Sequence, residues 1–530
     1  MAKKFICTAE EPVVETKNGK IRGFIWDGTY TFHGIKYADA KRFMPPTPVA
    51  PWEGIKDALN YGPNCPLLDN PMPSGEVLIP HRFWPANENC QYLNIWSRDV
   101  NKSAKKPVMV WLHGGGFSAG SAIEQVSYDG DNLATYGDVV VVTVNHRLNI
   151  LGYLDMSVFD KKGGKYSNSV NAGMADLVEA LKWVRDNIEA FGGDPNNVTI
   201  FGQSGGGMKV TVLGQIPEAE GLFHRAIVMS GIAEMNLSGD ADHAEVVRGI
   251  LAELDMKEDE VEKLEKINFA VLAKAFNRVN RKLRKEGKNV GWGPRKNDWY
   301  TGDPFEVGFS EFSKTVPTMV GTVVAEFGFA PGTPKKNELS ADERRGILKE
   351  RYKDYTDDLI AAFKKAYPGK NELDLVYIDT MFRPATLKYA DIKSGAASAP
   401  LYSYMVALEF EYDYGKLCWH CGDIPFFFHN AELVPICNID GVTERLQEEM
   451  AGAFVAFAKG GDPNHKNLCE WTRYTPDNKA TLVFDRKTEV RIDYEAELLD
   501  LLKKATPPFD FSAMMRRDDE DEEELRAWMY

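Results

Sequence analysis

The strongest local constraint on this chain is a serine framed by glycines at the end of a predicted strand. Residues 198–201 are β-branched or aromatic, as in a buried strand, and Gly202-Gln203-Ser204-Gly205-Gly206 follows at once. In a sharp turn from strand to helix, glycines let neighbouring backbone pass close to the serine because they have no Cβ atom. The turn lifts the hydroxyl out of the sheet and directs the helix N-terminus at any oxyanion formed beside it. Ser204 is therefore the candidate nucleophile.

A second glycine-rich turn further upstream supports this interpretation. Residues 108–112 read as a buried strand, and His113-Gly114-Gly115-Gly116 follows it. A turn of this kind supplies backbone N–H groups that surround a developing negative oxygen, together with the N–H of the residue after the nucleophile. Two unrelated tight turns could also carry these glycines, but they would have to imitate two parts of one site in the right order. The predicted oxyanion donors are Gly115, Gly116 and Gly205.

A serine nucleophile needs a general base, and three histidines follow at a suitable distance. His420 comes after the strand-like residues 401–408 and a polar turn, which places it on a loop at a strand's end. His465 lies in Asp-Pro-Asn-His-Lys and reads as a solvated surface turn. His429 follows three phenylalanines and reads as a satisfied, partly buried side chain. The preferred base is His420.

The acid that orients the base should lie between the serine and the histidine in the chain. Residues 316–322 predict another buried strand, and Glu326 follows just past its end. Asp298 and Asp303 are alternatives in a turn region rich in proline and glycine. Asp423 lies three residues from His420 and is better interpreted as fixing the loop. Glu326 is the preferred acid.

An ordered series of further motifs runs along nearly the whole chain, at residues 18–23, 32–38, 88–95, 145–152, 191–195, 227–231 and 457–464. With the two glycine-rich turns, these motifs resemble the type-B carboxylesterases, the family of the cholinesterases and bacterial para-nitrobenzyl esterases. The resemblance implies an α/β-hydrolase fold with a large, mostly parallel central β-sheet flanked by helices, and with helical insertions covering the active-site cleft. It also implies a catalytic triad, an oxyanion hole and a hydrogen-bonding residue behind the triad: Ser204, Glu326 and His420; Gly115, Gly116 and Gly205; and Ser230.

Three positions depart from the family pattern. Gln203 stands where the family usually has glutamate, Gly205 where it usually has alanine, and Lys209 where a small polar residue is common. Without a carboxylate at position 203, the pKa of His420 should be raised less than in relatives with glutamate there. The sequence does not determine which way the ammonium group of Lys209 points.

The length of 530 residues suits one extended domain, residues 1–530, with insertions. β-Branched runs such as residues 139–144 alternate with helical patterns such as residues 176–184, which is the rhythm of a mostly parallel sheet. Residues of about 240–290 and 340–390 should form helical insertions over the site, the second one beginning with the capping box Ser340-x-x-Glu343.

The net charge of −15 argues against nucleic acid or an anionic membrane surface as a partner, because such a field repels polyanions. No segment has the length of apolar residues that spans a membrane, and the first residues have no apolar core of a signal peptide. We therefore expect a cytoplasmic protein, or a secreted one if a signal peptide has been removed. The sequence leaves the oligomeric state open.

Seven cysteines, an odd number, fit a reducing compartment. By the family resemblance Cys65 and Cys90 occupy the positions of a disulfide, so an oxidised pair is an alternative. Cys418 and Cys421 have the spacing of a redox or metal pair, but no second pair completes a zinc site. The sequence implies no cofactor and no metal.

These features predict a serine carboxylic-ester hydrolase that forms an acyl-enzyme on a small-molecule ester. One alternative is an inactive, cholinesterase-like binding protein, and another is an amidase or acyltransferase that uses the same triad. An uncharged, apolar or aromatic ester is suggested by candidate wall residues: Trp84, Phe117, Trp292, Phe327, Phe329, Trp419 and Phe426.

Overall fold

Runs of β-branched residues form the buried central strands. In the computed structural model β10 (Lys106–Leu112) and β11 (Val140–Val144) pair in parallel, with Val110 opposite Val142, and every residue of β11 is buried. On its other side β10 pairs in parallel with β12 (Gly193–Gln203). Strands covered on both faces need apolar residues at successive positions, which explains these runs. The three strands predicted in these segments are confirmed.

The structure describes residues 4–68, 79–160, 164–234, 236, 239–328, 336–412 and 414–507. The chain divides into two units. Unit 1 comprises residues 1–72, 81–227 and 235–316, and unit 2 comprises residues 73–80, 228–234 and 317–530. The prediction of one extended domain stays a prediction. Within the described ranges, no helix is both long enough and apolar enough to cross a membrane.

The main sheet of unit 1 follows the order β1, β4, β5, β9, β11, β10, β12 and the start of β13. Neighbouring strands are antiparallel from β1 to β11 and parallel from β11 to β12. The further strands of this sheet are β1 (Phe5–Ile6), β4 (Phe24–Trp26), β5 (Thr29–Lys36), β9 (Tyr92–Ser97) and β13 (Arg225–Met229). Two small sheets hold β2 (Val13–Glu15), β3 (Lys20–Arg22) and β8 (Ile55–Asp57), and β6 (Ala38–Ala40) with β7 (Pro46–Pro48).

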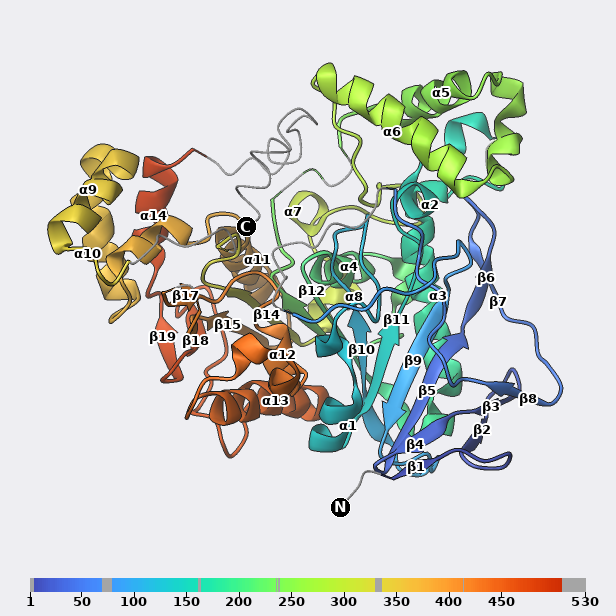
Figure 1. The fold of residues 1–530 in the computed structure, drawn as a ribbon, viewed down its shortest axis with the longest axis horizontal. Coiled ribbons are helices and arrows are strands. Elements are labelled where there is room, and N and C mark those ends of the chain that lie inside the picture. Colours follow the sequence, from blue (N-terminus) through green and yellow to red (C-terminus); the bar gives the residue numbers. More distant parts are fainter. Residues whose placement is uncertain are drawn as a thin grey trace. The chain divides into compact units, whose positions relative to one another are not determined.

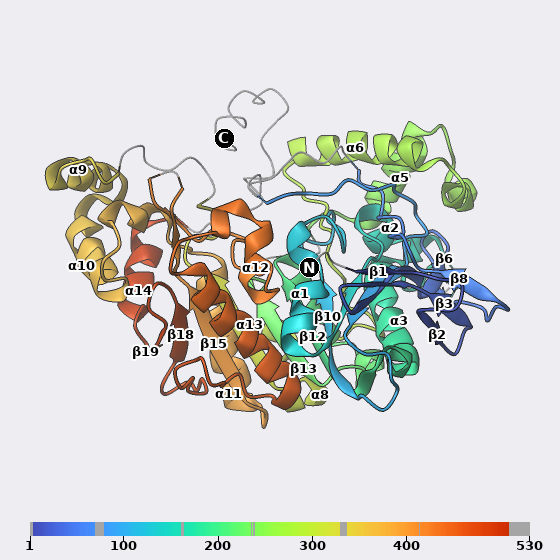
Figure 2. The same ribbon diagram turned by 60° about the horizontal axis from the view of Figure 1, so that its bottom comes forward.

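Helices flank the sheet of unit 1 (Figures 1 and 2). Helix α1 contacts β9 and β11, while α3 and α4 contact β12. The helices are α1 (Asp131–Gly137), α2 (Asn149–Tyr153), α3 (Ala172–Asn187), α4 (Gly205–Leu213), α5 (His243–Glu253), α6 (Phe269–Lys285), α7 (Pro304–Val307) and α8 (Glu311–Thr315). Helices α5 and α6 occupy the first predicted insertion, and a core that includes Val247, Ile250 and Phe276 packs them on Ile150 of α2.

The sheet strands of unit 2 are β14 (Thr318–Val323), β15 (Leu401–Val406) and β18 (Ala480–Phe484), which are parallel, and β19 (Glu489–Ile492), which is antiparallel to β18. Neighbouring residues of β15 point to opposite faces. Tyr404 lies 6.3 Å from Phe454 of α13 between ring centroids, and Ser403 accepts a hydrogen bond from Arg383 of α11 at 3.5 Å. Helices therefore cover both faces of this sheet.

The remaining elements of unit 2 lie around this sheet (Figure 2). They are α9 (Ala341–Tyr352), α10 (Thr356–Ala366), α11 (Phe382–Ala396), α12 (Ile424–Phe427), α13 (Thr443–Gly460), α14 (Ala496–Ala505) and a hairpin of β16 (Glu409–Phe410) with β17 (Lys416–Leu417). Ser340 and Glu343 form the predicted capping box at the start of α9. Helices α9, α10 and α14 share a core with Val324 and Ala325, the two residues before Glu326. The second insertion thus anchors the segment that presents Glu326.

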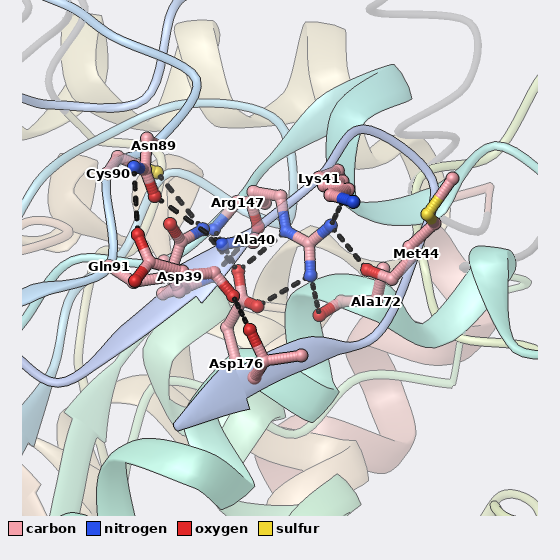
Figure 3. A network of polar contacts seen from close by, with 12 residues as sticks. Asp39, Ala40, Lys41, Met44, Asn89, Cys90, Gln91, Arg147, Ala172 and Asp176 are labelled. Atoms are coloured by element: carbon pink, nitrogen blue, oxygen red, sulfur yellow. Dashed lines mark hydrogen bonds and ion pairs between the residues drawn. The ribbon is translucent and has the colours of Figure 1, made fainter. Parts of the chain in front are cut away.

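A buried ion pair connects several loops of unit 1 (Figure 3). The guanidinium of Arg147 donates to both carboxylate oxygens of Asp176, at 2.6 and 2.9 Å, and both side chains are essentially inaccessible. Arg147 also donates to the backbone carbonyls of Lys41, Met44 and Ala172. This one side chain therefore ties the loop after β6 to the start of α3.

Candidate active site

Ser204 stands in a strained turn between β12 and α4. Its backbone has φ of 57° and ψ of −127°, a region that residues with a Cβ atom rarely adopt. A carbon built in the Cβ position of Gly206 would lie 2.9 Å from the carbonyl carbon of Leu112 at the end of β10. Only glycine fits there without moving β10. The strand, turn and helix predicted around Ser204 are all present.

The glycine-rich loop after β10 packs directly on this turn. Gly115 and Gly116 have φ of 80° and 60°, and a Cβ built on Gly114 would lie 3.5 Å from the Cβ of Ser204. A Cβ built on Gly205 would lie 2.5 Å from the backbone nitrogen of Gly116. That contact explains why this chain has glycine rather than alanine after the serine. Unit 1 therefore brings the predicted nucleophile and the three predicted oxyanion donors into one place.

Gln203 also lies in this corner of unit 1. It is fully buried, and its side-chain oxygen would be 3.4 Å from a Cβ on Gly114. A neutral amide, rather than a carboxylate, thus adjoins the glycine-rich loop.

Lys209 points back under the same loop from the second turn of α4. Its Nζ donates a hydrogen bond to the backbone carbonyl of His113 at 2.9 Å, and the side chain is fully buried. Burial lowers the pKa of Lys209 to about 7, and the carboxylate of Glu124 opposes that shift. The sequence signalled this residue as unusual, but its direction and its partner emerge only in the structure.

Unit 2 brings Glu326 and His420 together. Oε2 of Glu326 accepts a hydrogen bond from Nδ1 of His420 at 2.6 Å, and Oε1 accepts one from the backbone N–H of Val323 at 3.0 Å. Backbone bonds align the two segments, from Ala325 N–H to the Cys418 carbonyl and from His420 N–H to the Glu326 carbonyl. The glutamate is inaccessible and the histidine side chain is 16% exposed. The carboxylate can therefore hold Nδ1 protonated and leave Nε2 as a base.

Two phenylalanine rings lie against the imidazole of His420. The ring centroid of Phe382, at the start of α11, is 5.3 Å from it, and that of Phe327 is 6.0 Å away, each at an interplanar angle of 16°. Phe327 belongs to the predicted wall residues, whereas Phe382 carries no sequence motif and was missed. These rings give the base an apolar, aromatic surround.

The charge of Glu326 acts on two further buried carboxyl groups. Burial and the neighbouring Glu326 raise the pKa of Asp379 to about 7, and they do the same for Asp423. Asp379 accepts backbone hydrogen bonds from Met381 and Arg383. The backbone carbonyl of Asp423 accepts hydrogen bonds from the N–H groups of Phe426 and Phe427 at the start of α12, and its role in fixing the loop stays a prediction. The sequence did not single out Asp379, because only folding brings it close to Glu326.

Ser230 follows β13 and belongs to unit 2. Its backbone N–H donates to the Gly321 carbonyl of β14 at 2.7 Å. Its hydroxyl is buried and has no hydrogen-bond partner in the described part of the chain. The role of a hydrogen-bonding residue behind the triad stays a prediction.

The alternative histidines have other environments. His429 is partly buried and its Nε2 lies 3.4 Å from Oε1 of Glu448, which fits the prediction of a satisfied, partly buried side chain. The turn around His465 is exposed at Asp462, Asn464 and Lys466, as predicted. The imidazole itself is half-buried, because its Nε2 lies 3.1 Å from the Glu449 carbonyl of α13 and its ring packs against Gly452.

The other aromatic residues that the sequence suggested as walls of the site have varied environments. Phe117, Trp419 and Phe426 are buried, Trp292 packs against the core of α5 and α6, Trp84 is 38% exposed, and Phe329 lies outside the described residues.

All seven cysteines are free thiols, including Cys65, Cys90, Cys418 and Cys421. Among the described residues no group of histidine, cysteine and acidic side chains could hold a metal ion.

Comparison with known proteins gives matches along nearly the whole chain. A family model described as the carboxylesterase family matches residues 10–502. Para-nitrobenzyl esterase of Bacillus subtilis (strain 168) is 31% identical over 494 residues, 92% of this chain and 97% of that protein. Phenmedipham hydrolase of Pseudarthrobacter oxydans is 30% identical over 504 residues, with coverage of 91% and 97%. A solved esterase of Clostridium hathewayi, described as able to hydrolyse aliphatic aromatic polyesters, is 51% identical, with a TM-score of 0.92 and coverage of 95% and 100%.

Proposed function

The chain belongs to the carboxylesterase family and is a serine ester hydrolase, and we propose that Ser204 is its nucleophile, His420 its base and Glu326 the acid that orients the base. One observation carries this assignment. The strained turn at Ser204 packs against the glycine-rich loop so closely that a Cβ on Gly205 would lie 2.5 Å from the Gly116 nitrogen. Such packing brings the backbone of the glycine-rich loop beside Ser204, where oxyanion donors are needed.

The proposed reaction has two halves. Nε2 of His420 takes the proton of Ser204 as the serine oxygen attacks the ester carbonyl, and N–H groups of Gly115, Gly116 and Gly205 bind the oxyanion. The tetrahedral intermediate collapses, the alcohol leaves with the proton from His420, and an acyl-enzyme remains. Water activated by the same histidine then releases the acid. Glu326 supports both halves, because its hydrogen bond to Nδ1 fixes the tautomer and stabilises the imidazolium.

We propose uncharged esters with an aromatic or apolar acyl or alcohol group as substrates. The phenylalanine rings at 5.3 and 6.0 Å from the imidazole of His420 support this class, because they surround the base with apolar surface. The names of the similar proteins point in the same direction: para-nitrobenzyl esters for one and aliphatic aromatic polyesters for another.

We also propose a reducing compartment, the cytoplasm, as the place of action. The free state of all seven thiols, Cys65 and Cys90 included, supports this placement.

A panel of p-nitrophenyl and aryl esters of increasing acyl length, run on the wild type and on Ser204→Ala, tests the assignment. The wild type should hydrolyse the panel and lose activity on titration with an organophosphate. Ser204→Ala should fold normally and lose several orders of magnitude in kcat/KM, because only a hydroxyl is removed from the turn. Thr211→Val, a change further along α4, serves as the matched control and should remain active. Activity of Ser204→Ala near that of the wild type would refute the nucleophile assignment.

A further inference from the structure

Lys209 carries a fully buried amino group, and burial lowers its pKa to about 7. A buried ammonium group is costly unless it is paired or well hydrogen-bonded. The hydrogen bond that the structure gives its Nζ goes to the carbonyl of His113, the residue that opens the glycine-rich loop.

The groups around this ammonium are neutral or aromatic. The imidazoles of His113 and His146 stack with centroids 5.0 Å apart, and the ring of Phe117 lies 5.8 Å from Nζ. Each histidine uses Nδ1 to reach a backbone carbonyl at 2.9 Å, which places the proton on Nδ1 and leaves Nε2 as a lone pair with no partner in the described part of the chain. Burial, and then the charge of Lys209, hold the pKa of both imidazoles well below the usual value. Glu124 is the acidic side chain whose charge reaches Lys209.

The hydrogen bond from Lys209 reaches the segment that carries the proposed oxyanion donors. Lys209 binds the carbonyl of the peptide between His113 and Gly114, which leads into Gly115 and Gly116. Both glycines have positive φ angles here, and because glycine has no Cβ atom this segment is conformationally free in the unfolded chain. Oxyanion donors are effective because they are already in place when charge develops. A tether from the helix behind the nucleophile would supply that order.

We propose that Lys209 is a positioning residue that holds residues 113–116 on the nucleophile turn through its hydrogen bond to the His113 carbonyl. This inference rests on the proposed function, because it needs the N–H groups of Gly115 and Gly116 to bind the oxyanion. The tether acts through the backbone of the loop, so its effect belongs to the transition state rather than to substrate binding.

Lys209→Met tests the inference, because it keeps the length of the side chain and removes the hydrogen bond to the His113 carbonyl. We expect kcat to fall by about 10- to 100-fold, less than the roughly 100- to 1,000-fold that follows loss of a direct donor. KM should stay within about twofold, and the Ki of a trifluoromethyl ketone, which mimics the tetrahedral intermediate, should rise in parallel with the fall in kcat/KM. A merely structural role would lower the melting temperature without this split.

Thr211→Val is the control in the same helix, because the hydroxyl of Thr211 donates to the backbone carbonyl of Met208. It should leave kcat and inhibitor binding unchanged. If Lys209→Met does not fold, Lys209→Gln carries the same test, since its amide nitrogen ends one bond short of the Nζ position and so gives up the hydrogen bond to the His113 carbonyl while keeping a polar group.

The outcomes separate the two proposals. Unchanged kcat and inhibitor binding in the folded variant, with an inactive Ser204→Ala, would overturn the role of Lys209 alone. A loss confined to KM would overturn it as well. An active Ser204→Ala would overturn the proposed function instead.

Discussion

The substitution Asp176→Asn should strongly lower the free energy of unfolding of unit 1, although it changes the shape of the side chain only slightly. The carboxylate of Asp176 accepts hydrogen bonds from Nε, Nη2 and the backbone N–H of Arg147 and from Gln91 (Figure 3). Both partners of the ion pair are essentially inaccessible, at 1% and 0% of side-chain exposure. The substitution leaves the guanidinium charged and unpaired, which costs about 3–5 kcal/mol of unfolding free energy.

Arg147→Met and the double variant show how much of this loss of unfolding free energy comes from the unpaired charge. Arg147→Met should lose a similar amount of unfolding free energy, because it leaves a buried carboxylate without its cation and removes the donor to the carbonyls of Lys41, Met44 and Ala172. The double variant no longer contains an unpaired charge, so its loss should be smaller than the sum of the single losses by at least about 2 kcal/mol. It should not return to wild-type stability, because each carbonyl left without a donor costs about 1 kcal/mol or more.

Urea unfolding followed by tryptophan fluorescence, with native-state hydrogen exchange of the β11 amides, measures these differences. The exposed pair of Arg22 and Asp57, at 2.7 Å, provides the control, since Arg22→Met should cost far less than either substitution in the buried pair. Losses in the Arg147 and Asp176 variants as small as in this control, or strictly additive losses in the double variant, would refute the reasoning.

Three further predictions concern the site. His420→Ala should lose most of kcat, and its combination with Ser204→Ala should add little, because triad residues act as a unit; kcat/KM of the single and double variants checks this. In Gln203→Glu the new carboxylate should raise the pKa of His420, so the acidic limb of the kcat/KM profile should move to higher pH and the wild type should keep activity to lower pH; an unmoved limb contradicts this. Gly205→Ala should lower kcat, because its Cβ would press on the Gly116 nitrogen from 2.5 Å; wild-type turnover in a folded variant would argue against the oxyanion assignment.

Local patterns were sufficient for the parts of the site that depend on short stretches of chain. The strand before Ser204, the glycines around it and the glycine-rich loop at residues 113–116 could be predicted from the sequence. The reason is that a buried strand, a positive φ angle and the absence of a Cβ atom each leave a mark within a few consecutive residues. The capping box at Ser340 could be predicted for the same reason.

Choices between residues far apart in the chain were harder to make from the sequence. Glu326 and His420 were preferred over several alternatives by chain order and by the family resemblance, and their hydrogen bond becomes visible only when two loops are aligned by backbone bonds. His465 read as a solvated turn, yet it packs on α13. A turn sequence does not reveal which helix will cover it.

The sequence by itself determined the strand-and-turn framework of the nucleophile, the glycines of the loop beside it and the chemical types of the candidate triad. Only the tertiary structure decided that Lys209 binds the carbonyl of His113, 96 residues away, and that Asp379 and Phe382 adjoin Glu326 and His420. The physical reason is that burial and partner choice fix the charge and direction of a side chain, and both are properties of segments brought together by folding.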